Sequence, residues 1–141
     1  MPKGSERVLF IDDELPIVTM TSKMLERLGY RVTTEISSIE ALALFRKDPD
    51  AFDLIITDMA MPNMVGDQLA LELRKIRPDI PIILCTGYSK RLANGSAAMI
   101  GVRALLYKPI VKRNLARKVR EVLDNSRDPQ QGSAPPGSTT A

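Results

Sequence analysis

Five short strand-like stretches alternate with helical patterns along this chain, and this alternation constrains the fold more than any other feature. The stretches lie at residues 7–11, 31–35, 52–57, 80–85 and 102–106. Most of them are too apolar for one face to meet water, so we expect helices on both faces of a parallel sheet. The predicted fold class is therefore α/β, a doubly wound five-stranded parallel sheet.

Helical patterns fill the intervals between these stretches. They cover residues 15–28, 39–47 and 67–77, and a last helix contains Leu115, Val119 and Val122. The side chains expected on the core-facing side of the first two helices are Ile17, Thr21, Met24 and Leu28, and Ile39, Leu42 and Phe45. Residues 86–101 form a weak helical pattern that Asn94-Gly95 interrupts, which predicts a segment of low local stability.

The 141-residue length suits one domain. After Asn125 the sequence is rich in Pro, Gly, Ser and Gln, so we predict a domain at residues 1–125 and a flexible tail at 126–141. The longest apolar runs are strand-sized, which excludes a membrane-spanning helix. With no signal-peptide pattern at the start and a single cysteine, we expect a cytoplasmic protein.

The net charge is +3, and much of the excess comes from KRNLARKVR at residues 112–120. No aromatic residues interleave with these basic residues, so we interpret the segment as the solvated face of a helix and expect no direct nucleic-acid binding. The chain has no histidine. Imidazole catalysis and histidine-ligated metals are therefore excluded, and any metal must bind oxygen ligands or Cys85.

Acidic residues follow two of the predicted strands. The first strand runs directly into Asp12-Asp13, and the third ends at Asp58. Ligands of such sheets collect at the carboxyl ends of the strands, where Thr86 and Lys108 also lie. Adjacent carboxylates repel one another, so the cluster predicts a cation, and Mg²⁺ is the natural choice because it combines one or two carboxylates with waters and phosphate.

Phosphate chemistry follows from this combination. Mg²⁺ neutralises phosphoryl oxygens, lysine adds a positive charge, and a carboxylate can act as a nucleophile to form an aspartyl phosphate. Asp58 suits the nucleophilic role because it stands alone at the end of its strand, before a loop that can open to solvent.

The segments FIDDE, IITDMAMPNMVG, LCTG and LLYKPI together resemble the receiver domain of bacterial two-component response regulators, over about residues 6–123. Pro62 and Gly66, which follow Asp58 by four and eight residues, are part of this likeness. The resemblance implies a CheY-like, flavodoxin-like fold with strand order 2-1-3-4-5. It also implies a Lys108–Pro109 peptide bond in the cis form.

The resemblance implies roles for the acidic residues. Asp58 would accept a phosphoryl group from a phosphohistidine on a sensor histidine kinase or a histidine phosphotransfer domain. Asp13, Asp58 and the backbone carbonyl of Ala60 would bind Mg²⁺, and Asp12 would position the ion through water. No further cofactor is expected, and we expect a monomer or weak dimer.

The resemblance also assigns Lys108 and Thr86 to contacts with the phosphoryl group. Phosphorylation would then shift the face made by residues 88–98, the strand 102–106 and the last helix. The family often has Tyr or Phe three residues before the lysine, where this chain has Leu105, with Tyr107 nearer to the lysine. Ala60 and Tyr88 occupy positions that modulate water access in the family.

An enzyme and a nucleotide-binding protein are the alternatives to a signalling module. A haloacid-dehalogenase-like phosphatase also uses an aspartate nucleophile and Mg²⁺, but it needs a second aspartate where this chain has Ala60. A nucleotide-binding protein would need a glycine-rich phosphate loop, and no GxxxxGK occurs. We therefore expect no enzyme beyond self-catalysed phosphorylation and dephosphorylation.

The wider context of the domain is also a prediction. The segments PKGSERVLFIDDE, GYS and ALLYKPI resemble receivers of hybrid sensor histidine kinases, and a stand-alone regulator is the alternative. The donor should dock beside Asp58, near Ile17, Met20 and Met24 of the first helix. Of these three, Met20 is the one we expect to be exposed. Cys85 is expected to be an inert core thiol, and Met59, Met61 and Met64 to fill space near the site.

Overall fold

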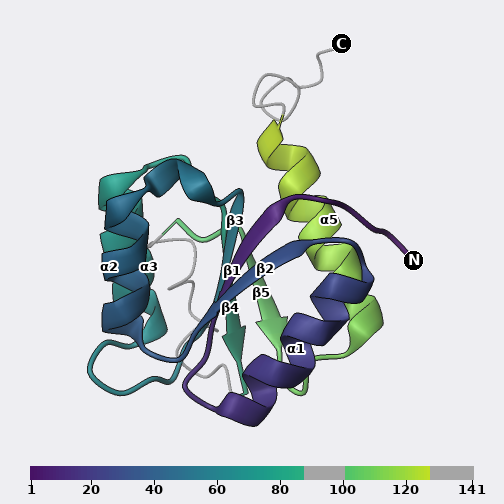
Figure 1. The fold of residues 1–141 in the computed structure, drawn as a ribbon, viewed down its shortest axis with the longest axis horizontal. Coiled ribbons are helices and arrows are strands. Elements are labelled where there is room, and N and C mark those ends of the chain that lie inside the picture. The colour runs from purple at the N-terminus through teal and green to yellow at the C-terminus, as the bar shows by residue number, and fades with distance from the viewer. Residues whose placement is uncertain (88–100, 128–141) are drawn as a thin grey trace.

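A computed structural model describes residues 1–87 and 101–127 and contains one five-stranded parallel sheet (Figure 1). The strand order is β2-β1-β3-β4-β5, so the predicted fold class and order are confirmed. The strands are β1 (Arg7–Ile11), β2 (Arg31–Glu35), β3 (Leu54–Asp58), β4 (Ile82–Thr86) and β5 (Ala104–Tyr107). Tyr88, Asn94-Gly95 and most of the predicted tail lie outside the described residues.

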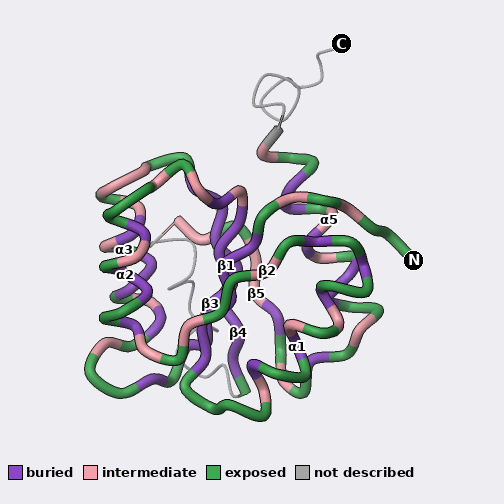
Figure 2. Tube along the Cα trace, in the orientation of Figure 1, coloured by how far each residue is buried: buried purple, intermediate pink, exposed green. Residues whose placement is uncertain are grey.

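Helices cover both faces of the sheet, as the apolar strands require. The helices α1 (Leu15–Arg27) and α5 (Lys112–Arg127) lie on one face, and α2 (Ser38–Lys47) and α3 (Gly66–Ile76) lie on the other (Figure 1). A short 3₁₀ turn, η1 (Pro49–Ala51), leads from α2 into β3. Each layer has its own apolar cluster against the sheet, and the buried residues in the centre of the molecule follow β1, β3 and β4 (Figure 2).

The helix boundaries follow from local chemistry. Pro16 sits in the first turn of α1, where its missing N–H costs no hydrogen bond. Gly29 follows the end of that helix with φ 101°, a conformation that glycine adopts without a steric penalty. At the start of α2, the Ser37 hydroxyl accepts a hydrogen bond from the Glu40 N–H at 3.3 Å.

Two predicted helix faces differ from the structure. Of the core residues predicted for α1, Thr21 and Leu28 are buried. The predicted Ile17 and Met24 are only partly buried against the same cluster, and Val18 and Leu25 are buried in addition. In α2, Ile39 was expected in the core, but it is 47% exposed. The predicted core residues Leu42 and Phe45 are buried. Ser38 and Ala41 are buried with them, in place of Ile39.

A half-buried cluster of hydrogen bonds and ion pairs joins the N-terminal segment to α5. Arg120 donates from Nη2 to Glu6 Oε2 at 2.6 Å and from Nη1 to Glu6 Oε1 at 3.1 Å. The same guanidinium donates to the Lys3 carbonyl, the Tyr30 hydroxyl and Asp124. This cluster fixes α5 against the start of the chain, at the end of the domain away from Asp12.

No helix among residues 1–87 and 101–127 is long and apolar enough to cross a membrane.

Candidate phosphoacceptor and metal site

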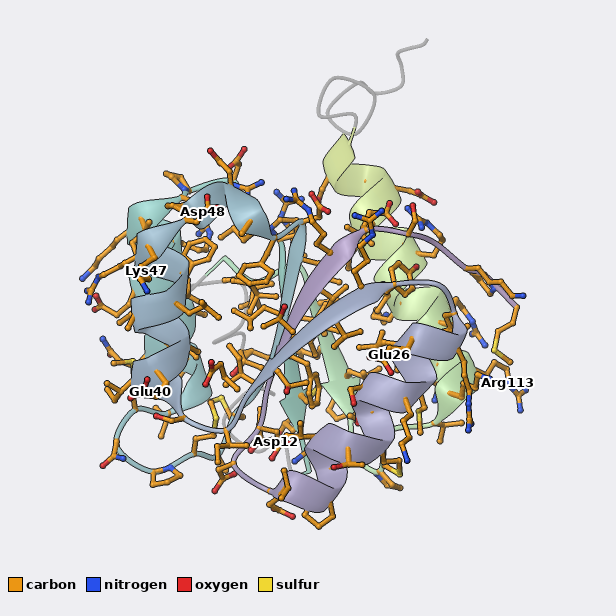
Figure 3. The ribbon with its side chains drawn as sticks, viewed as in Figure 1. Asp12, Glu26, Glu40, Lys47, Asp48 and Arg113 are labelled. Carbon is orange, nitrogen blue, oxygen red and sulfur yellow. The ribbon has the colours of Figure 1, made fainter. Side chains whose placement is uncertain are left out.

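Three carboxylates meet at the carboxyl ends of β1 and β3. One oxygen each of Asp12, Asp13 and Asp58 can be chosen so that all lie within 4.8 Å of one another. Asp12 and Asp58 are buried, whereas Asp13 is exposed. Figure 3 shows Asp12 at the edge of the sheet where α1 and α2 begin, opposite to Lys47 and Asp48. The sequence prediction that these acids share one pocket is thus matched by the geometry.

Parallel register explains this convergence. Ile11, the last residue of β1, pairs with Thr57, and Asp58 pairs with Cys85 of β4. Thr86 in turn pairs with Tyr107 of β5. Four neighbouring strands, β1, β3, β4 and β5, therefore end at the same edge of the sheet, and the residues at and just past their ends surround one pocket.

Lys108 bridges the two buried carboxylates. Its Nζ lies 3.0 Å from Asp12 Oδ2 and 2.8 Å from Asp58 Oδ1. Burial opposes the charge on this ammonium, but the hydrogen bonds to Asp58 and Asp12 outweigh burial and raise the pKa of Lys108 above its usual value. The Lys108–Pro109 peptide bond is cis, as the resemblance implied.

The surroundings of Asp58 disfavour the ionised form of its carboxyl group. Burial raises the pKa of its carboxyl, and the nearby charges of Asp12 and Asp13 raise it further. The hydrogen bond from Lys108 works in the opposite direction, and the net effect is a raised pKa. A cation close to these carboxylates would relieve the repulsion and favour the ionised form.

Thr86 lies on the far side of the pocket from β1. It is the last residue of β4 and is 3% exposed. Its carbonyl accepts a hydrogen bond from the Lys108 N–H at 2.9 Å, which ties the ends of β4 and β5 together. The structure therefore brings all five predicted side chains to one edge of the sheet.

The loop after β3 carries Ala60, whose carbonyl the resemblance assigns to the metal. Ala60 is exposed, and it lies between two buried methionines that pack in different apolar clusters, Met59 with Leu84 and Met61 with the α2–α3 layer. The methionines thus fill space beside the site, as predicted. They also anchor the backbone on both sides of Ala60.

Gly66 closes this loop against the backbone of Asp58. Its N–H donates to the Met59 carbonyl at 2.7 Å. A Cβ at position 66 would lie 2.3 Å from the Asp58 carbonyl oxygen and 2.7 Å from Met59 Cα, so any larger residue would displace this backbone. The eight-residue spacing from Asp58 identifies Gly66 in the sequence, but the close contact with the Asp58 backbone is seen only in the folded structure.

Three further residues near the site differ in burial. Cys85 is fully buried, and burial and then the nearby Asp58 charge raise the pKa of its thiol to about 12. It is therefore a neutral thiol at physiological pH and a poor nucleophile. Leu105 is partly buried against Met59 and Leu84, whereas Tyr107 is 53% exposed. A cavity of about 380 Å³ opens between β5 and α5, lined in part by both residues.

The donor set fits a magnesium ion. Carboxylate and carbonyl oxygens are the ligands that this ion prefers, and the three clustered acids leave room for water in its coordination shell. Softer metals would call for sulfur or imidazole, and the one thiol, Cys85, is buried within β4.

The five-stranded parallel sheet in this order, with acids, a threonine and a lysine at one edge, is the arrangement expected of a receiver domain. A family model described as "Response regulator receiver domain" matches residues 8–120. The chain belongs to this family, which serves two-component signalling systems.

Individual relatives agree with the family match. The sensor kinase CckA of Brucella abortus is 32% identical over 121 residues, which cover 86% of this chain but only 13% of the kinase. A crystal structure of a response regulator receiver domain protein from Clostridium thermocellum is 32% identical, with a TM-score of 0.80, and covers 86% of this chain and 97% of that one.

A third structure shares the fold at lower identity. It is the receiver domain of a sensor histidine kinase from Pseudomonas aeruginosa, with a magnesium ion coordinated in its active-site cleft. It is 24% identical, with a TM-score of 0.76, and covers 86% of this chain and 99% of that one.

Proposed function

We propose that this domain accepts a phosphoryl group on Asp58 from a phosphohistidine, in a reaction that requires Mg²⁺. A carboxylate oxygen of Asp58 attacks phosphorus, and the bond between phosphorus and the donor imidazole nitrogen breaks, with its electron pair staying on that nitrogen. The proton already on the other ring nitrogen leaves with the ring, which departs as neutral imidazole. The observation that carries the proposal is the pocket itself: three carboxylates with Lys108 bound between two of them.

Asp13, Asp58 and the Ala60 carbonyl are the proposed direct ligands of Mg²⁺, with Asp12 acting through water. When bound, the ion neutralises charge on the phosphoryl oxygens. The family match and the magnesium ion in the cleft of the Pseudomonas receiver support this assignment. The raised pKa of Asp58 supports it too, because a pocket that disfavours the carboxylate on its own is suited to a cation.

Lys108 and Thr86 are the proposed contacts of the transferred group. In the structure the Lys108 ammonium forms ion pairs with both Asp12 and Asp58. Once Asp58 is phosphorylated, its carboxyl is part of a neutral anhydride linkage and the negative charge lies on the phosphoryl oxygens, so the ammonium can follow that charge without leaving the pocket. The Thr86 hydroxyl would add a hydrogen bond to the same group.

We propose that this rearrangement is transmitted along β4 and β5 to α5. The Lys108 N–H to Thr86 carbonyl bond joins the two strand ends, and the cavity between β5 and α5 adjoins them. The segment 88–98, the third part of the predicted output face, lies outside the described residues.

The proposed donor is a sensor histidine kinase or a histidine phosphotransfer domain. Since the domain spans 13% of CckA, its place in a hybrid sensor kinase is a proposal, with a stand-alone regulator as the alternative. Met20 is 42% exposed, whereas Ile17 and Met24 are partly buried against the core. Met20 is therefore the proposed docking residue of the three. We propose no catalytic turnover of an external substrate, and a generic phosphate ester should show no sustained hydrolysis.

A metal titration of folding stability tests the proposal. An ion that binds only the native state at ten times its Kd stabilises that state by about 1.4 kcal/mol. Millimolar Mg²⁺ should therefore raise the melting temperature of the wild type, and Asp13→Ala should remove most of that increase. Asp79→Ala is the matched control. Its 80% exposed carboxylate pairs with Arg77 and lies before the start of β4, at the opposite end of that strand from the pocket. An equal response in all three proteins would contradict the assigned metal site.

A further inference from the structure

Ser38 is a buried serine that helix α2 does not need for capping. It is 2% exposed and is the first residue of the helix, but the capping hydrogen bond is accepted by the hydroxyl of its neighbour Ser37. A buried hydroxyl without a partner is costly, so a serine at this position must satisfy its hydroxyl elsewhere.

The hydroxyl of Ser38 reaches the loop that follows β3. Its Oγ donates to the Met64 carbonyl at 2.7 Å, across a separation of 26 residues, and it also lies 3.6 Å from Met61 Sδ. Both methionines belong to the loop that carries Ala60. One side chain of α2 thus holds the loop at two points, one of which directly follows Ala60.

Other contacts hold the remainder of the loop. Gly66 closes its base through the bond to the Met59 carbonyl. Asn63 turns its tip with φ 70°, and the Met64 N–H there bonds to the Pro62 carbonyl at 2.7 Å. The bond from Ser38 adds a hydrogen bond between this turn and α2 to the apolar packing of Met61 and Met64, and so it helps to fix the turn relative to the sheet.

We propose that Ser38 is a positioning residue that holds the β3–α3 loop so that the Ala60 carbonyl faces the metal pocket. Ser38 touches neither the metal nor the phosphoryl group; it acts through Met61 and Met64. The inference rests on the proposed function, because it concerns the carbonyl that would complete the magnesium site. Without the hydroxyl, the loop spends less time in the metal-competent arrangement, and apparent affinity falls with that fraction.

Adjacent serines provide a matched test. In full-length protein, Mg²⁺ is titrated while amide signals of Asp13, Met59 and Met64 are followed by NMR. Ser38→Ala should weaken Mg²⁺ binding about threefold to tenfold, as expected for the loss of one buried hydrogen bond. Ser37→Ala should lower the melting temperature through the lost cap but leave the Mg²⁺ Kd within twofold of the wild type.

Amide exchange gives a second readout that general destabilisation would not produce. In Ser38→Ala the Met64 and Gly66 amides should exchange faster, while those of Leu25 in α1 exchange as in the wild type. An unchanged Mg²⁺ Kd in Ser38→Ala, or an equal loss in Ser37→Ala, would overturn the positioning role alone. A wild type that binds no Mg²⁺ would instead overturn the proposed function and this inference together.

Discussion

Replacing Gly66 with alanine tests how closely the loop is packed on the phosphoacceptor. The added Cβ would lie 2.3 Å from the Asp58 carbonyl oxygen and 3.0 Å from the Asp58 carbonyl carbon. Carbon–oxygen contacts ordinarily lie at about 3.3 Å or more, so the backbone must move by roughly 1 Å. The obstacle is main chain on both sides, and no side-chain rotation can relieve it.

The expected cost follows from two opposing terms. Overpacking of this kind destabilises by about 1–3 kcal/mol, whereas replacing glycine by alanine restores about 0.4–1 kcal/mol by restricting the unfolded chain. The φ of Gly66 is outside the left-handed region, so no torsional penalty is added. The net loss of about 1–2 kcal/mol should lower the melting temperature by roughly 3–6 °C.

The rate of Asp58 phosphorylation should also fall, and by more than the loss of folding stability alone would cause. A misplacement of about 1 Å at a reacting group can cost about 100-fold in rate, so Asp58 labelling by acetyl phosphate should slow by one to two orders of magnitude. Gly87→Ala is the control, because a Cβ there would meet nothing within 4 Å among the described residues. Thermal unfolding and labelling rates are measured on both variants. If Gly66→Ala behaves like Gly87→Ala in both assays, the packing argument is wrong.

Three other substitutions test separate parts of the structure. Thr21→Val should raise the free energy of unfolding by about 1 kcal/mol in urea titrations, since its buried hydroxyl has no hydrogen-bond partner among the described residues; a loss of stability would contradict this. Glu6→Gln should destabilise by about 1–2 kcal/mol at neutral pH. The hydrogen bond from Arg120 lowers the pKa of Glu6 from 4.5, so this difference should be complete above pH 4.5 and shrink as pH falls through the folded-state pKa; a difference independent of pH would refute it. Met20→Asp should slow transfer from a phosphorylated kinase but leave acetyl-phosphate labelling intact, and equal loss with both donors would remove the docking proposal.

The sheet was predictable because its signals are local. Apolar strands separated by helices determine a parallel sheet, and the level ends of parallel strands bring Asp12, Asp58 and Lys108 together. The sequence alone therefore groups the residues just past each strand. The side chains of the metal and phosphoryl pocket belong to this predictable part.

Contacts between distant segments were not predictable in the same way. Ile39 has the right spacing for a core position, but Ser38 takes an inward place, where its hydroxyl donates to the Met64 carbonyl, 26 residues away. The Arg120 cluster similarly joins residues that are more than a hundred positions apart. Hydrophobic periodicity contains no signal for such polar partners, since they are chosen by the assembled fold.

Trapping the modified residue shows whether Asp58 forms the acyl phosphate. Wild type and Asp58→Asn are incubated with acetyl phosphate and Mg²⁺, reduced with borohydride to convert an aspartyl phosphate to homoserine, and mapped by mass spectrometry. Homoserine should appear at position 58 of the wild type, require Mg²⁺, and be absent from Asp58→Asn. Homoserine at another aspartate, or phosphoryl label at the wild-type level in Asp58→Asn, would contradict the account.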